Sequence, residues 1–128
     1  MSYAIRHIPE MEIVELGFTG TISGSALKEA TTQCIRLQKE MGITRFLVDG
    51  NDWEVAASVV DIYKLPAEQY WDEKVLRQTR IAVVMPGSAD AQEAVQFYRD
   101  ACWNQGWNAQ IHLDRKSALD WLTDSSDD

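Results

Sequence analysis

The sequence predicts a single-domain α/β fold, in which an opening antiparallel hairpin precedes alternating strands and helices in a mixed β-sheet. Three observations predict it. The chain has 128 residues, which is enough for one domain with its own hydrophobic core. Short apolar runs recur at residues 44–49 and 80–85, as expected for strands buried on both faces. Between them, apolar residues recur at steps of three and four, as in amphipathic helices.

The chain is expected to open with a β-hairpin. Residues 3–8 alternate loosely in polarity and predict a first strand, and residues 11–19 predict a second. Pro9 and Glu10 form a turn signal between them. A connection of only two residues makes the pair antiparallel. Gly20 is expected to end the second strand.

A long helix is predicted next. Ser23 or Ser25 can cap its start, because a serine oxygen accepts hydrogen bonds from free amides there, and Gly42 marks its end. Its apolar residues form one stripe: Leu27, Ala30, Thr31, Cys34, Leu37 and Met41. After strand 44–49, residues 55–63 again have helical spacing.

The second half continues the alternation. Pro66 is expected to break or kink the helix, and residues 67–77 form another short helix. Strand 80–85 is followed by a helix at 89–105 that Ser88 caps. A strand at 109–113 and a short helix that ends at residue 122 complete the order ββαβαβαβα.

Composition limits the function classes. The net charge is −8, from 20 acidic and 12 basic residues, so a polyanion such as a nucleic acid would be repelled. The two cysteines, Cys34 and Cys102, are expected to be buried free thiols. Neither a signal peptide nor an apolar run long enough to span a membrane is recognised, so we expect a cytoplasmic protein. Residues 1–123 are expected to form the domain, and residues 124–128 an acidic, disordered tail.

An acidic corner, Asp49-Gly50-Asn51-Asp52, follows the central strand and is a candidate for chemistry. It lacks the spacing of a calcium loop and the second aspartate of an Asp-Xaa-Asp phosphatase, because Asn51 stands in that place. No cofactor or metal ligand set is predicted. Magnesium-dependent phosphotransfer at Asp49 and Asp52 is kept as a third hypothesis, and turn formation is the simpler interpretation.

Four motifs, in this order and spacing, resemble the STAS superfamily (sulfate transporter and anti-sigma-factor antagonist domains), specifically its SpoIIAA-like branch. They are residues 17–23 (GFTGTIS), 47–49 (LVD), 80–84 (RIAVV) and 118–122 (ALDWL). The resemblance extends over nearly the whole chain. It implies a small cytoplasmic module that works by contact with a protein partner.

In some members of this family a serine after the central strand is phosphorylated. Here only Ser58 lies near the corresponding place, and it lacks the preceding acid and the following glycine. The branch is also similar to lipid-binding folds in which helices after the central strand cover an apolar cavity. That similarity implies a lid formed by residues 55–76, whereas the simpler interpretation is that these side chains complete the core.

Three hypotheses therefore stand. The first is a non-enzymatic regulatory or protein-interaction module that binds a protein partner or forms a homodimer. The second is a carrier or sensor of a small apolar, lipid-like ligand under residues 55–76, and the third is the phosphotransfer site. The candidate interaction or ligand surface consists of Trp53, Ser58, Tyr63, Tyr70 and Trp71. No catalytic residue is assigned.

Overall fold

A computed structural model describes residues 2–50 and 53–124 of the chain. Within these residues the strands are β1 (Ser2–Ile8), β2 (Ile13–Ile22), β3 (Arg45–Asp49), β4 (Trp53–Val55), β5 (Arg80–Val84) and β6 (Asn108–His112). The helices are α1 (Gly24–Met41), α2 (Val59–Lys64), the π-helical turn η1 (Leu65–Gln69), α3 (Tyr70–Asp72), α4 (Ala89–Asn104) and α5 (Arg115–Leu122).

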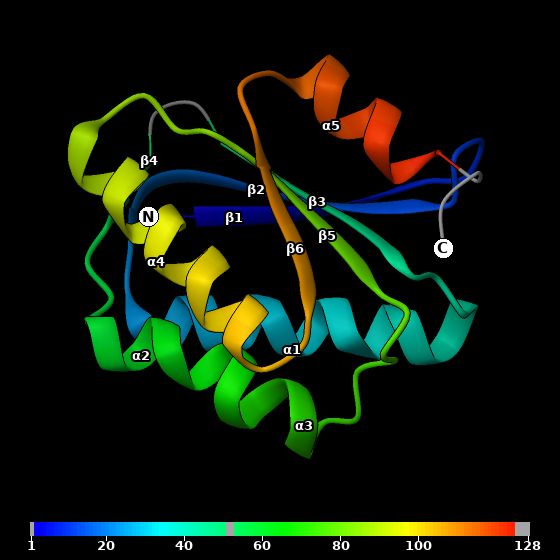
Figure 1. Cartoon of the computed structure of the whole chain (residues 1–128), viewed down its shortest axis with the longest axis horizontal. Helices are drawn as coiled ribbons and strands as arrows, with labels where there is room; N and C mark the ends of the chain where they lie inside the picture. Colours follow the sequence, from blue (N-terminus) through cyan, green and yellow to red (C-terminus); the bar gives the residue numbers. More distant parts are fainter. Residues whose placement is uncertain (1, 51–52, 125–128) are drawn as a thin grey trace.

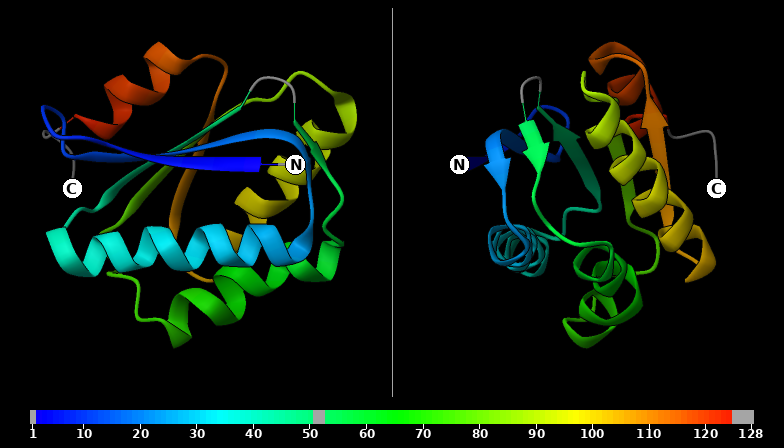
Figure 2. Two further views of the ribbon diagram at one scale, coloured as in Figure 1. Left: turned by 180° about the vertical axis from the view of Figure 1, so that it is seen from behind. Right: turned by 90° about the vertical axis from the view of Figure 1, so that its left-hand side faces the viewer.

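The strands form one mixed sheet in the order β1-β2-β3-β5-β6 (Figure 1). β1 is antiparallel to β2, whereas the pairs β2–β3, β3–β5 and β5–β6 are parallel. The helices α1, α4 and the α2–α3 segment cover one face, and α5 covers the other (Figure 2). The predicted fold class, a hairpin followed by βα units in a mixed sheet, is therefore confirmed.

The connection in the hairpin is longer than predicted. β1 ends at Ile8 and β2 begins at Ile13, so four residues form the turn instead of two. The amide of Met11 donates to Ile8, and Glu12 has a positive φ of 55°. The turn therefore needs Glu12, just before β2, to adopt a left-handed backbone conformation. The Pro9-Glu10 turn signal did not predict that requirement.

A second difference lies at the end of β2. The strand does not stop at Gly20 but continues to Ile22, where it pairs in parallel with the short strand β4. Trp53 lies opposite Gly20, and Val55 lies opposite Ile22. The prediction that a helix begins at residue 55 is therefore wrong, because backbone pairing with β2 determines the conformation of this segment.

The helix after β4 also differs from the prediction at Pro66. The chain does not break there. It widens into the π-helical turn η1, in which the amide of Tyr70 donates to the carbonyl of Leu65, and α3 follows without interruption. A wider turn accommodates a proline ring that has no amide proton to donate. The helix then ends at Asp72 rather than at residue 77.

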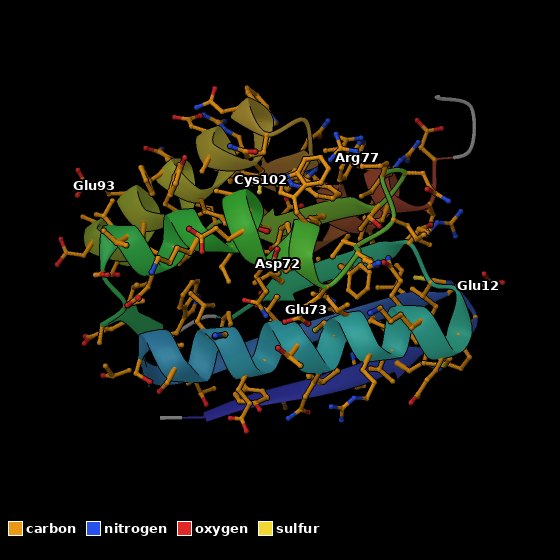
Figure 3. The ribbon with its side chains drawn as sticks, turned by 90° about the horizontal axis from the view of Figure 1, so that it is seen from below. Glu12, Asp72, Glu73, Arg77, Glu93 and Cys102 are labelled. Carbon is orange, nitrogen blue, oxygen red and sulfur yellow. The ribbon has the colours of Figure 1, made fainter. Side chains whose placement is uncertain are left out.

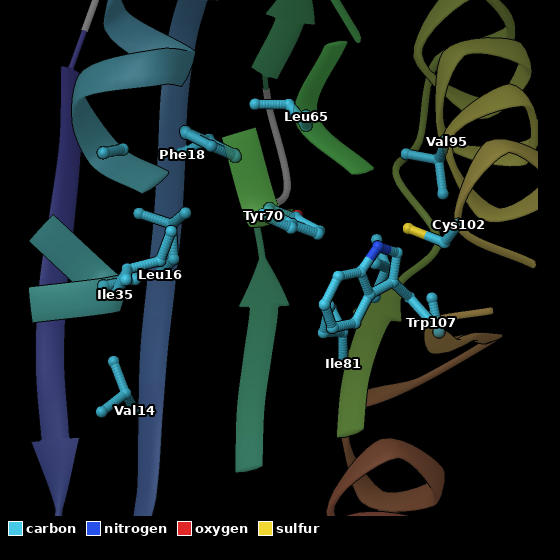
Figure 4. Packing of buried hydrophobic residues seen from close by; sticks show 14 of the residues in the cluster. Val14, Leu16, Phe18, Ile35, Leu65, Tyr70, Ile81, Val95, Cys102 and Trp107 are labelled. Atoms are coloured by element: carbon cyan, nitrogen blue, oxygen red, sulfur yellow. The ribbon is translucent and has the colours of Figure 1, made fainter. Parts of the chain in front are cut away.

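Alternation along the strands divides the core into two layers. The larger layer lies under α1, the α2–α3 segment and α4, and includes Leu16, Phe18, Tyr70, Val95 and Trp107 (Figure 4). The smaller layer lies under α5 and consists of Ile13, Leu47, Ala82, Val84, Ala118 and Leu122. Both cysteines are buried free thiols in the larger layer, as predicted.

Candidate ligand cavity beneath the second helix

The structure places the five predicted site residues in different environments. Trp53 and Tyr70 are buried, each with 7% of its surface exposed, and both line the same interior cavity. Tyr63 and Trp71 are 45% exposed on the outer side of the helical segment. Ser58 caps α2. The sequence therefore identified one set of residues that the fold divides between an interior and a surface.

Two adjoining cavities lie between the sheet and the helices of the larger layer. The first measures about 80 Å³ and the second about 60 Å³. They share five lining residues: Leu16, Thr31, Val48, Tyr70 and Tyr98. Together they approach the size of an engineered cavity of about 150 Å³ that binds benzene. The space is thus large enough for a small ring compound.

The lining of this space is apolar. The first cavity is bounded by β-strand residues such as Phe18 and Val83, by Ile62 and Leu65 of the helical segment, and by Val95 of α4. Among the described residues, no Asp, Glu, Lys, Arg or His side chain lines either cavity. A charged group that entered would lose its hydration without gaining an opposite charge. The chemistry of the lining therefore favours an uncharged occupant.

A pair of tyrosines marks the junction of the two cavities. The hydroxyl oxygens of Tyr70 and Tyr98 are 2.6 Å apart and share one hydrogen bond. Burial raises the pKa of both tyrosines, so both remain neutral. Burial likewise raises the pKa of the Cys34 and Cys102 thiols to about 12. Such thiols are protonated at neutral pH and are poor nucleophiles.

Trp53 also lines the first cavity. Its ring contacts the ring of Phe18, with 4.9 Å between the centroids. Its Nε1 is buried and has no hydrogen-bond partner among residues 2–50 and 53–124. The edge of the ring lies against Gly50, where a Cβ would be 2.7 Å from Cδ1 and 3.1 Å from Nε1. Trp53 can hold this position only because residue 50 has no side chain.

Residues 66–76 cover the cavity and are fastened on two sides. On one side, Gln69 donates to the carbonyl of Lys28 and to the hydroxyl of Thr32, both on α1. On the other, the buried indole of Trp107 donates to the carbonyl of Pro66 at 3.0 Å. Figure 3 shows this segment between α1 and α4. These contacts hold this half of the predicted lid in place.

The other half, α2, packs beside α4 and η1. Ile62 is its one buried residue, and it lines the first cavity. Ser58 and Asp61 form a capping box, because Ser58 Oγ accepts from the amide of Asp61 and Asp61 Oδ2 accepts from the amide of Ser58. Val59 and Val60 face outward, with 62% and 58% of their surfaces exposed.

Aromatic and cationic side chains close the far end of the helical segment. The rings of Trp71 and Trp107 lie 4.9 Å apart. The guanidinium of Arg77 lies over both rings, at 4.4 Å from Trp71 and 4.1 Å from Trp107, and donates to the carbonyl of Gly106. Trp71 is therefore half-exposed but already has partners within the chain.

Asp49, the first residue of the acidic corner, faces α5 on the opposite side of the sheet. Asp49 accepts a hydrogen bond of 3.0 Å from Arg115 at the start of α5. Arg115 also makes a bidentate pair with Glu15, at 2.7 and 2.8 Å, and these bonds hold the pKa of Glu15 below its ordinary value. Asp49 is thus held by an ion pair with Arg115, and Asp52 lies outside the described residues.

Sequence reasoning missed several of these groups. Arg115 is far from Asp49 in the chain, and no spacing rule could have paired them. Tyr98 lies on α4 and its partner Tyr70 on another element, so no local pattern pairs them. Among the described residues no group of three or more His, Cys, Asp or Glu side chains could hold a metal ion. No described helix is long and apolar enough to cross a membrane.

Comparison with known proteins identifies the fold. No family model and no curated protein matches this sequence. The chain is similar to a crystal structure described as an uncharacterized protein from the DUF3478 family, from Shewanella loihica PV-4, with a SpoIIAA-like fold. The TM-score is 0.59 at 22% identity, and the match covers 94% of this chain and 92% of the other. The chain has a SpoIIAA-like fold.

This result confirms the resemblance predicted from residues 17–23, 47–49, 80–84 and 118–122 at the level of the fold. At this identity a structural match defines architecture and carries no activity. The function of this SpoIIAA-like domain must therefore be argued from its own cavity and surface.

Proposed function

We propose that this SpoIIAA-like domain is a non-enzymatic carrier or sensor that binds a small apolar ligand beneath the α2–α3 segment. One observation carries the proposal: two adjoining apolar cavities lie where the helical segment covers the sheet. Well-packed interiors hold few voids larger than a water molecule, and each void reduces stability. A cavity that lowers the stability of the empty fold is well suited to bind a ligand that fills it.

Other observations support binding without catalysis. The buried thiols of Cys34 and Cys102 have a raised pKa, and Asp49 is held by Arg115 on the other face. α2 contributes a single buried residue, Ile62, to the roof of the first cavity. A short outward movement of α2 would open a path for a ligand at little cost in buried surface.

The test uses toluene as a probe with the purified full-length chain. We expect saturable binding by ligand-observed NMR and a rise in melting temperature that grows with toluene concentration. The variant Val83→Ile/Val95→Ile, which extends two side chains of the lining into the first cavity, should lose this binding while it remains folded. Absence of saturable binding to the wild-type chain would overturn the proposal.

A second candidate function, a protein-interaction module, rests on the outer face of α2. Val59, Val60 and Tyr63 are exposed together, and exposed aliphatic and aromatic side chains are typical of contact surfaces. A polar groove of about 330 Å³ adjoins them, lined by the carboxylates of Asp61, Glu68, Asp72 and Glu73 and by the amines of Lys28 and Lys64. An apolar protein segment flanked by basic residues would fit this surface best.

The partner in this second candidate function could be another copy of the chain. Sedimentation velocity across a range of protein concentrations measures such a homodimer directly. If α2 is the interface, Val59→Ser/Tyr63→Ser should abolish a concentration-dependent dimer. Leu113→Ser is the matched control, because Leu113 is 84% exposed and lies just before α5. A chain that remains monomeric at all concentrations would exclude self-association and leave a different protein partner as the occupant of α2.

A further inference from the structure

The strand β1 lies at one edge of the sheet, and its outer side carries no strand in the described part of the chain. There β1 pairs with β2 alone (Figure 2). In an antiparallel pair, the backbone groups of alternate residues point away from the neighbouring strand. About half of the amides and carbonyls of β1 are therefore directed outward. Such a row is a template for the addition of one more strand.

β1 lacks the sequence features that normally keep an edge strand from pairing. Its seven residues, SYAIRHI, include neither proline nor lysine. They match β2 one for one over the whole length of β1, so no bulge turns the strand away. Arg6 is its one arginine, and Glu15 of β2 accepts from it at 3.0 Å. The charge of Arg6 is therefore balanced within the chain and does not by itself repel a second strand.

The other edge of the sheet is partly blocked. β6 has five residues, and the carbonyl of His112 points to β5, where it accepts from the amide of Met85. Alternation along the strand then directs the carbonyl of Ala109 away from β5. That carbonyl already accepts from the indole of Trp103, at 2.7 Å. A strand added at β6 would have to displace this side chain, so β1 is the more open edge.

A second copy of β1 fits this edge. Two identical strands can pair antiparallel about a two-fold axis, and each then satisfies the same outward backbone groups of the other. On the helix side, α1 runs beside β1, and Gln33 of α1 donates to the hydroxyl of Tyr3. Glu29 and Arg36, one turn to either side of Gln33, are exposed and carry opposite charges. Two such helix faces that meet antiparallel can place unlike charges opposite each other.

We propose that this chain forms a symmetric homodimer in which the β1 strands of two copies pair antiparallel and join the two sheets into one. With the two-fold axis at the middle residue, Ile5, all seven residues overlap, and Ala4 lies opposite Arg6 of the other copy. The inference does not depend on the apolar cavity. Figure 2 shows α1 between β1 and α2, so this dimer leaves the outer face of α2 accessible to a different protein.

Sedimentation velocity of the full-length chain, up to about 1 mM because small interfaces are weak, should show a concentration-dependent dimer. Ala4→Lys sets a lysine against Arg6 of the other copy at both ends of the strand pair. Ala4 is exposed, so the variant should fold. We expect its dissociation constant to rise roughly tenfold, because like charges directly opposite each other destabilise paired strands.

Ala4→Glu is the matched counterpart, because it sets a carboxylate against the same Arg6. It should keep or tighten the dimer, although it makes the net charge of −8 more negative, whereas Ala4→Lys makes it less negative. Overall repulsion between copies would give the opposite order of the two variants. Val59→Lys, at an exposed site on α2, is a second control and should leave the dissociation constant nearly unchanged.

Hydrogen exchange locates the contact. The amides of residues 2–8 should exchange more slowly at high protein concentration, while those of α2 should not change. A chain that stays monomeric up to the highest concentration would overturn the inference, and so would a dimer that Val59→Lys dissociates and Ala4→Lys does not. Neither result affects the ligand proposal, which toluene binding tests separately.

Discussion

Val83→Ile tests most directly whether the first cavity is empty volume that an added methylene can fill. Val83 lies on β5, is 3% exposed and lines the cavity of about 80 Å³. Isoleucine adds one methylene, whose burial contributes about 0.8 kcal/mol. The loss of empty volume contributes a similar amount, at about 24 cal/mol per Å³. Allowing for imperfect fit, we expect the free energy of unfolding to rise by roughly 0.5–1 kcal/mol.

Val14→Ile is the matched control. Val14 is a strand valine in the same layer, is 0% exposed, and lines neither cavity (Figure 4). Its added methylene has no space to enter, and overpacking costs about 1–3 kcal/mol. The two variants should therefore shift stability in opposite directions, although both change valine to isoleucine on a β-strand.

Urea unfolding followed by tryptophan fluorescence measures both free energies, and toluene titration measures binding. Val83→Ile should stabilise the chain and weaken toluene binding at the same time, whereas Val14→Ile should destabilise the chain and leave the intrinsic affinity of the folded state nearly unchanged. If Val83→Ile destabilises the chain as much as Val14→Ile does, the cavity is filled by the protein itself and the volume argument is refuted.

Further predictions concern the ion pairs and the glycine beside the indole. Arg115→Ala removes the cationic partner of Asp49 and leaves Glu15 paired only with Arg6, so it should lower stability by about 1–3 kcal/mol in urea unfolding at pH 7. Because Arg115 holds the pKa of Glu15 below its unfolded value, the stability that this pair contributes is present above the ordinary carboxyl pKa of about 4.3 and is lost as the pH falls through the lower, folded pKa. The Arg115→Ala variant should therefore show a flatter decline in acid, and an unchanged slope would contradict the assignment. Gly50→Ala should displace Trp53 and be visible as a changed near-UV circular dichroism spectrum, while an unaltered spectrum would show that the indole has room to move.

Local signals in the sequence were sufficient for much of the architecture. Ser23, Ser88 and Gly42 were identified as helix boundaries from their own chemistry, and the structure has all three at those positions. Apolar periodicity placed α1 and α4, and the runs at 44–49 and 80–85 became β3 and β5. These features depend on neighbours within about four residues, so they can be read along the chain.

The candidate site could be predicted only in part. The sequence pointed to the aromatic residues of segment 53–71, and Trp53 and Tyr70 do line the cavity. It gave no sign that Trp53 belongs to a strand, because that strand exists only through pairing with residues 20–22 of β2. It also gave no sign that the outer residues of α2 face solvent, since helical spacing does not say which side the rest of the domain covers.

What the sequence determined by itself is the order of the elements apart from β4, the helix ends at Ser23, Gly42 and Ser88, and the resemblance to a SpoIIAA-like fold, because turn chemistry, capping and periodicity are local. The tertiary structure alone decided the rest. It brought Arg115 to Asp49 and Glu15, set Tyr98 against Tyr70, and buried the ring of Trp53 against Phe18 and Gly50. Each of these contacts joins side chains from elements that are distant in the sequence. Their burial and pairing are therefore properties of the packed chain rather than of any one segment.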